Sequence, residues 1–123
     1  MVVFFGLPTA VENKSDKTAD ISLPMYCRNA EGPVYLAVVF QKDNHPVKAA
    51  DSSFSDDQGN FIVRTKADCL EKSEMAPTVL HVPAGAVSEK DRSLKAEAFA
   101  SDNGQLIANT KLFDVHIPKS KRN

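Results

Sequence analysis

The chain has 123 residues, of which 42% are apolar and 25% are charged, and these fractions are typical of one soluble globular domain. Fifteen basic residues against sixteen acidic ones give a net charge of −1, so the chain has no overall positive field for binding nucleic acid. No apolar run approaches the roughly 20 residues that cross a bilayer, which argues against a membrane partner.

Seven segments have the composition of β-strands, because their apolar residues recur at a spacing of two or form short runs. The segments are Val2–Phe5, Ala19–Cys27, Val34–Gln41, Phe61–Lys66, Thr78–Val82, Ser93–Ala100 and Leu106–Val115. Polar turns separate them, and this pattern predicts an antiparallel β-sandwich of about seven strands. Pro24 in the second segment has no N–H to donate, so we expect that strand to lie at a sheet edge or to carry a bulge.

The third segment is apolar on both of its faces. If the even-numbered residues of Val34–Phe40 point into the core, then Tyr35, Ala37 and Val39 lie on the outer face of the sheet. Phe99 falls on the outer face of its own segment by the same alternation. Exposed apolar groups indicate a partner surface, and an N-terminal segment, long side chains or a second copy of the chain are alternative covers for them.

Four stretches carry turn signals. Asn103-Gly104 suits a type I′ hairpin, because both residues tolerate positive φ. Asp43–Pro46 and Asp56–Asn60 predict two further turns, and the proline that ends the first should stop the preceding strand. Pro83–Asp91 predicts at most one short helical or 3-10 turn, which crosses between the sheets and begins with the help of its proline.

No linker divides the chain, so residues 1–118 are predicted to form one domain and the basic end, 119–123, a disordered tail. Cys27 and Cys69 are the only cysteines. Two unlinked thiols in a reducing compartment are the favoured interpretation and one disulfide is the alternative, which leaves the localisation open. A disulfide would contribute roughly 3–4 kcal/mol to stability.

Six stretches from Gly32 onward follow one another in an order seen in a known family. They are Gly32–Phe40, Asp43–Lys48, Asp57–Asn60, Leu80–Pro83, Leu94–Phe99 and Ala108–Phe113. This order resembles that of small bacterial immunoglobulin-like domains, which are mostly of unassigned function. The resemblance implies an all-β, immunoglobulin-like antiparallel sandwich without intrinsic catalysis. The family often has several aromatic residues in the first of these strands, where this chain has only Tyr35 and Phe40.

A second resemblance involves the stretches Pro46–Ala50 and Asp57–Phe61. Together they are similar to a pattern of transthyretin-like and carboxypeptidase-regulatory-like sandwiches. Ala49 stands where those domains usually have glycine. This resemblance also implies a β-sandwich without intrinsic catalysis.

The residues that could hold a metal ion are scattered. His45, His81 and His116 lie in separate segments without a partner at the spacing of zinc ligands, so no metal site and no cofactor is expected. His81 should lie on the solvent side of its strand. Asp56 and Asp57 are weak candidates for calcium, because the spacing of an EF-hand loop is not met.

A Ser-His-Asp set can be assembled from Ser52, Ser53 or Ser55 with Asp56 and His81. The sequence has no nucleophile elbow and no glycine-rich oxyanion loop to support such a set. We therefore do not expect an enzyme.

The sequence predicts a non-catalytic interaction module. It should bind another protein, or associate with itself, through an outer sheet face or an edge strand, where unpaired backbone groups accept a partner strand. Tyr35, Val39 and Phe99 are the predicted protein-binding residues. The alternative function is binding of carbohydrate or another small ligand by the loops at one end, assisted by calcium at Asp56 and Asp57.

Overall fold

The structure is a computed structural model that describes residues 2–67 and 78–120. Its strands are β1 (Val2–Phe4), β2 (Thr9–Asn13), β3 (Thr18–Leu23), β4 (Met25–Cys27), β5 (Val34–Lys42), β6 (His45–Pro46), β7 (Ile62–Ala67), β8 (Thr78–Pro83), β9 (Ser93–Asp102), β10 (Gln105–Asn109) and β11 (Phe113–His116). Two 3-10 turns, η1 (Ser52–Phe54) and η2 (Ala84–Ala86), are the helical elements of the described residues. The predicted all-β class is confirmed.

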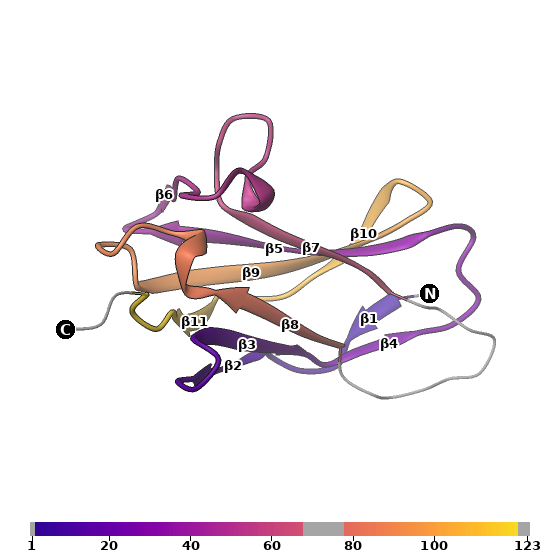
Figure 1. The fold of residues 1–123 in the computed structure, drawn as a ribbon. Coiled ribbons are helices and arrows are strands. Elements are labelled where there is room, and N and C mark those ends of the chain that lie inside the picture. The colour runs from indigo at the N-terminus through magenta and orange to yellow at the C-terminus, as the bar shows by residue number, and fades with distance from the viewer. Residues whose placement is uncertain (1, 68–77, 121–123) are drawn as a thin grey trace.

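Two antiparallel sheets lie face to face (Figure 1). In the first sheet β9 and β5 form the central pair, with β10 and β11 beside β9 and with β6 and β7 beside β5. The second sheet contains β2, β3 and β8, and the short pair β1–β4 continues it beyond Pro24. The predicted β-sandwich is therefore confirmed.

The described residues form eleven strands, whereas about seven were predicted for the chain. Two of the four additional strands arise because predicted strands are interrupted, between β3 and β4 and between β10 and β11. β2 lies in a stretch for which no strand was predicted, and β6 has only two residues. The limit of one helical turn is also wrong, because η1 forms where the carboxylate of Asp51 accepts the N–H of Ser53. The predicted turn after Pro83 is η2.

The core lies between the two sheets and is built from alternate residues of each strand. The even-numbered residues of Val34–Phe40 and of Leu94–Ala100 are buried, as are the odd-numbered residues of Ala19–Leu23. The rings of Phe40 and Phe61 stack with their centroids 4.1 Å apart. The predicted inward face of β5 is thus confirmed.

Type I′ turns join β9 to β10 and β5 to β6. Asn103 and Gly104 have φ angles of 52° and 83°, which confirms the predicted hairpin. Asp43 and Asn44 have φ angles of 51° and 65°, so the chain reverses at once. As a result Pro46 lies in β6 and pairs with β5, and the prediction that it merely stops the preceding strand is wrong.

Pro24 lies in the break between β3 and β4. The prediction of an edge strand or a bulge for Ala19–Cys27 is wrong for β3, which pairs with β2 on one side and with β8 on the other. It holds for β4, which among the described strands pairs with β1 alone. The missing N–H is accommodated by ending one strand and starting the next. The carbonyl of Pro24 still accepts the N–H of Phe5 at 3.0 Å.

Two predictions fall partly outside the described residues. Cys27 is disulfide-bonded, so the favoured interpretation of unlinked thiols is wrong; the other cysteine, Cys69, lies outside the described residues. Of the predicted tail, residues 121–123 also lie outside them. The N–H of Ser120 donates to the carboxylate of Glu89 at 3.2 Å.

Candidate functional site

The outer face of the first sheet brings together the three residues predicted to bind protein. Tyr35 and Val39 point outward from β5, and Ala37 between them pairs with Phe99 of β9. Since paired residues share one side of a sheet, these four side chains form one group, which we call the β5–β9 face. Tyr35 is 49% exposed, and Val39 and Phe99 are half-buried. The N-terminal strand β1 does not cover this face, because it pairs in the other sheet.

Basic residues border the β5–β9 face on the side of β7. Arg64 pairs with Ala37, and Lys66 pairs with Tyr35, so both project on the same side as the apolar group. Both side chains are exposed. Within the described part of the chain, no ion pair involves either of them. The face therefore has an apolar centre, with Arg64 and Lys66 on the side of β7 and with Glu97 beside Val39 on β9.

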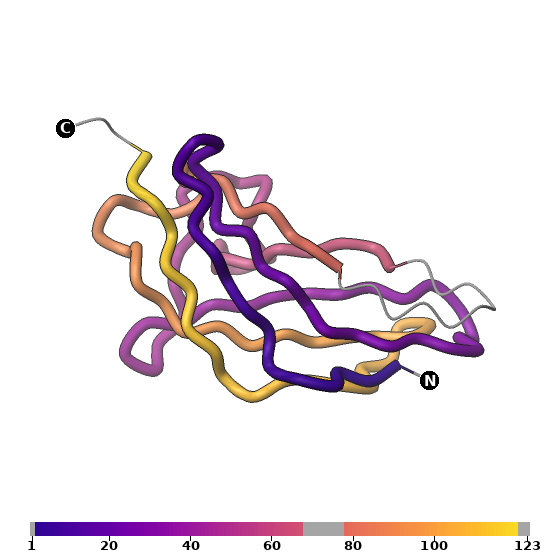
Figure 2. Tube along the Cα trace, turned by 90° about the horizontal axis from the view of Figure 1, so that it is seen from below, coloured from indigo at the N-terminus to yellow at the C-terminus, as the bar shows by residue number. Residues whose placement is uncertain are grey.

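A second group of exposed apolar residues lies along β1 and β2 of the other sheet. Figure 2 traces the course of this N-terminal segment, whose β2 runs beside β3. Five residues at a spacing of two are exposed there, and we call them the N-terminal stripe: Val3, Phe5, Leu7, Thr9 and Val11. Of the residues between them, Pro8 is buried, Phe4 and Ala10 are half-buried, and Gly6 is exposed in the bend that separates β1 from β2. Four of the nine large apolar residues that are exposed among the described ones belong to this stripe.

Sequence reasoning missed the N-terminal stripe. Gly6 and Pro8 interrupt the run and hid the strand that follows them. Val2–Phe5 alone is a short apolar run, which is typical of a buried strand. The signal that could have found the stripe is that apolar residues recur at a spacing of two from Val3 to Val11, with Thr9 as the exception.

His81 lies on the solvent side of β8, as predicted. Its Nδ1 is 2.8 Å from Oδ1 of Asp20, which is its cross-strand neighbour in β3. This contact, together with the hydroxyl of Thr18 that donates at 2.8 Å, holds the pKa of the Asp20 carboxyl below its usual value. No group of three or more histidine, cysteine or acidic side chains gathers around a possible metal position among residues 2–67 and 78–120.

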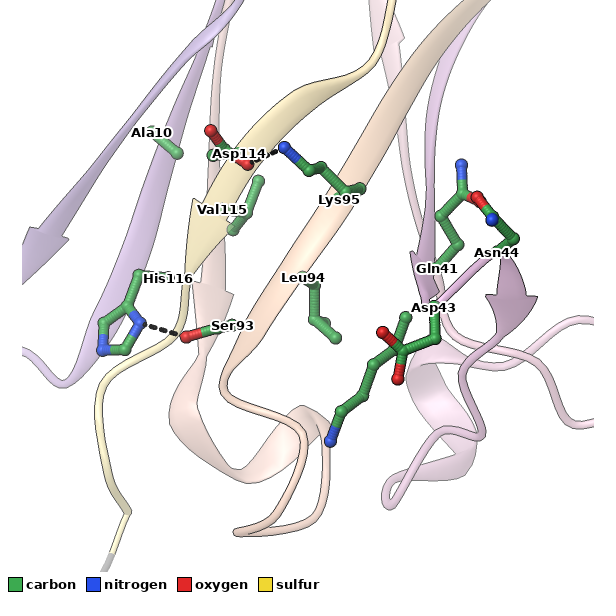
Figure 3. A pocket seen from close by; sticks show the side chains of 11 residues that line it. Ala10, Gln41, Asp43, Asn44, Ser93, Leu94, Lys95, Asp114, Val115 and His116 are labelled. Atoms are coloured by element: carbon green, nitrogen blue, oxygen red, sulfur yellow. Dashed lines mark hydrogen bonds and ion pairs between the residues drawn. The ribbon is translucent and has the colours of Figure 1, made fainter.

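A hollow of about 650 Å³ lies where β9 and β11 meet the end of β5 (Figure 3). Nζ of Lys95 lies 2.5 Å from Oδ1 of Asp114, and the hydroxyl of Ser93 lies 3.0 Å from Nδ1 of His116. The other ring nitrogen of His116 is 3.5 Å from Glu12.

Ser93, His116 and Glu12 follow a serine–histidine–carboxylate order, yet sheet register explains the contact between the first two. Lys95 and Asp114 are direct cross-strand partners, and so are Ser93 and His116. Both side chains of the second pair are exposed, and a contact of 3.5 Å is too long to fix the orientation of the ring. The four polar residues that β9 and β11 contribute to the hollow are thus ordinary cross-strand pairs.

Asp56 and Asp57, the weak calcium candidates, lie in the turn before β7. Oδ1 of Asp56 accepts the N–H of Asn60 at 2.9 Å and that of Gln58 at 2.8 Å. These two bonds hold the pKa of the Asp56 carboxyl below its usual value. Asp56 therefore caps its own turn. In the described structure no hydrogen bond links Asp56 or the nearby serines to His81, so the Ser-His-Asp set is not assembled.

Comparison with known proteins finds no family model, no curated protein and no solved structure that matches the chain. Among the described residues there is no helix with the length and apolar character needed to cross a bilayer. The candidate site consequently depends on the geometry of the two outer faces.

Proposed function

We propose that this protein is a non-catalytic β-sandwich module that binds another protein through the β5–β9 face. The observation that carries the proposal is the grouping of Tyr35, Val39 and Phe99 on one outer sheet surface, with Tyr35 half exposed to solvent. Aromatic residues at the centre of a surface patch are the usual anchors of protein interfaces. Surfaces of this kind on a soluble domain mark sites of association.

The charges beside the β5–β9 face indicate the chemistry of the partner. Arg64 and Lys66 project next to the apolar group, and among the described residues no acidic side chain pairs with them. An apolar surface bordered by aspartate or glutamate would match both features. Complementary charge mainly raises the association rate and selects the partner, while the apolar centre supplies most of the affinity.

We infer in addition that the sandwich is of the immunoglobulin-like type. In support, one sheet contains β9 and β5 at its centre with β10 and β7 beside them, and the facing sheet contains β2, β3 and β8. Joining the interrupted strands and leaving out the two-residue β6 gives seven long strands, the number typical of that fold.

A comparative pull-down tests the proposed function. The wild-type chain and the variant Tyr35→Ser/Val39→Ser/Phe99→Ser are immobilised and exposed to an extract of the cells that encode the protein. The triple variant should fold, since the three side chains face outward, and it should lose a specific protein that the wild type retains. Val11→Ser, on the other sheet, is the matched control and should retain it.

Salt provides the second readout of the same experiment. Retention of the partner should weaken between about 50 mM and 500 mM salt, because screening reduces the attraction of Arg64 and Lys66. Equal retention by the wild type and the folded triple variant would overturn the proposal. A triple variant that does not fold would show that these side chains belong to the core.

A further inference from the structure

We propose that the N-terminal stripe is a self-association surface, on which a second copy of this chain packs its own stripe across a two-fold axis. The outward residues Val3, Phe5, Leu7 and Val11 are between 40% and 64% exposed. When one face of an antiparallel sheet packs on the core, the residues on its outer face are normally polar. Here Val3 of β1 and Val11 of β2 face outward, and Phe5 and Leu7 of the connection between the two strands are exposed as well.

The size of the surface fits one copy of the chain. At roughly 150–200 Å² for a large side chain, the exposed parts of the stripe and of Val79 amount to roughly 400 Å² of apolar area. Val79 lies on the same face, because Ser22 of β3 pairs with it on one side and with Thr9 on the other. A stable interface buries roughly 800 Å² on each partner, of which roughly 60% is apolar. The apolar area of the stripe and Val79 is close to the apolar area that one partner of such an interface buries.

The order of residues in the stripe makes it self-complementary. A two-fold axis passing near Leu7 would set Val3 of one copy against Val11 of the other and Phe5 against Thr9. Phe5 then faces the smaller Thr9, whereas Val3 faces another valine and Leu7 faces its own counterpart. The same surface patch serves both copies, which is the defining property of a two-fold interface.

Charge favours a second copy as the occupant. No charged residue faces outward on β1 or β2 between Val3 and Val11. Packing two identical surfaces brings like groups close together, and a stripe without charges avoids the repulsion this would cause. A highly charged partner would find no complementary group along the stripe. The charged pair Asp20–His81 lies beside its end, next to Val11, where it can form part of a polar rim.

This inference is independent of the proposed function, because the two surfaces belong to different sheets of the sandwich (Figures 1 and 2). A dimer formed through the stripe leaves Tyr35 and Phe99 accessible on each copy. The dimer would then present two β5–β9 faces, so partner binding would gain avidity.

Sedimentation equilibrium of the full chain tests the inference. The wild type is measured at about 100 µM, well above the micromolar dissociation constant expected for a weak interface of this size. It should sediment at twice the chain mass of 13.4 kDa, with and without reductant. Phe5→Ser/Leu7→Ser should sediment at the single chain mass, while the matched double variant Tyr35→Ser/Phe99→Ser should remain at twice that mass.

Each other outcome overturns the inference. These outcomes are a monomeric wild type, a dimer that survives Phe5→Ser/Leu7→Ser, and a dimer that is lost only on changing the β5–β9 face. A dimer that reductant dissociates would show an intermolecular disulfide instead. If the double variant fails to fold, Val11→Thr replaces it in the test, because it changes only one methyl group to a hydroxyl at an exposed position. This variant should raise the dissociation constant of the dimer measurably.

Discussion

Arg92→Ala removes a buried guanidinium that joins three separate stretches of backbone. Nη1 donates to the carbonyl oxygens of Ala84 at 2.6 Å and Pro118 at 2.8 Å. Nη2 donates to the carbonyl of Val87 at 3.2 Å and to the carboxylate of Glu89 at 3.0 Å. Arg92 is only 8% exposed, so little water is available to replace these bonds. It thereby fixes the crossing turn η2 and the segment that follows β11 to the start of β9.

The magnitude of the loss follows from the three carbonyl bonds. A hydrogen bond to a charged donor contributes roughly 1.5–3 kcal/mol, and such bonds within one network are not additive. We therefore expect Arg92→Ala to lower the free energy of unfolding by about 3–5 kcal/mol. Since a domain of this kind is stable by roughly 5–15 kcal/mol, the melting temperature should fall by roughly 10–20 °C.

Urea denaturation followed by circular dichroism measures this loss. Arg64→Ala is the matched control, because Arg64 is exposed on β7, and it should change stability by less than about 0.5 kcal/mol. Arg92→Met keeps the apolar stem without the donors and should behave like Arg92→Ala, while Arg92→Lys should lie between that variant and the wild type. If Arg92→Ala cost less than about 1 kcal/mol, other donors would have to satisfy the carbonyls, and the reasoning would be refuted.

Three further changes test local features of the fold. Gly32→Ala should lower the melting temperature, because a Cβ there would lie 2.5 Å from Oδ1 of Asn103. An unchanged melting temperature would show that the side chain of Asn103 can move aside without cost. Thr110→Val should cost roughly 1–3 kcal/mol in urea denaturation, since it removes the hydroxyl that accepts the buried N–H of Ala98 at 3.0 Å. The pKa of the Asp56 carboxyl is lower in the folded protein than in the unfolded chain. The carboxylate therefore stabilises the fold at pH values above its unfolded-state pKa, and this stabilisation is lost as the pH falls through its folded-state pKa. The stability of Asp56→Asn should therefore fall less than that of the wild type between about pH 5 and about pH 2, and parallel pH profiles would contradict this.

Local chemistry explains which parts of the fold could be predicted from the sequence. The alternation in Val34–Phe40 located the core face of β5, and Asn103-Gly104 located a hairpin, because both signals lie within a few neighbouring residues. The outer position of Tyr35 followed from the same alternation.

Other parts depended on contacts between distant segments. Pro46 pairs with β5 because the two-residue turn before it reverses the chain, a geometry that a proline alone does not indicate. The disulfide of Cys27 requires a partner brought close by the fold, and the spacing of two cysteines does not report that approach. The stripe from Val3 to Val11 was missed because Gly6 and Pro8 separate β1 from β2 and made the second strand hard to identify in the sequence.

The pairing of β5 with β9 also determines how slowly the molecule can assemble. Its paired residues are separated in sequence by 68 positions at one end (102 − 34) and by 54 at the other (95 − 41). Closing loops of this length before any contact is gained places folding in the range of milliseconds to seconds, whereas a hairpin such as β9–β10 can form within roughly 1–10 µs. During synthesis β5 therefore leaves the ribosome well before its principal neighbour exists. A strand that is apolar on both faces is then the segment most in need of protection by a chaperone.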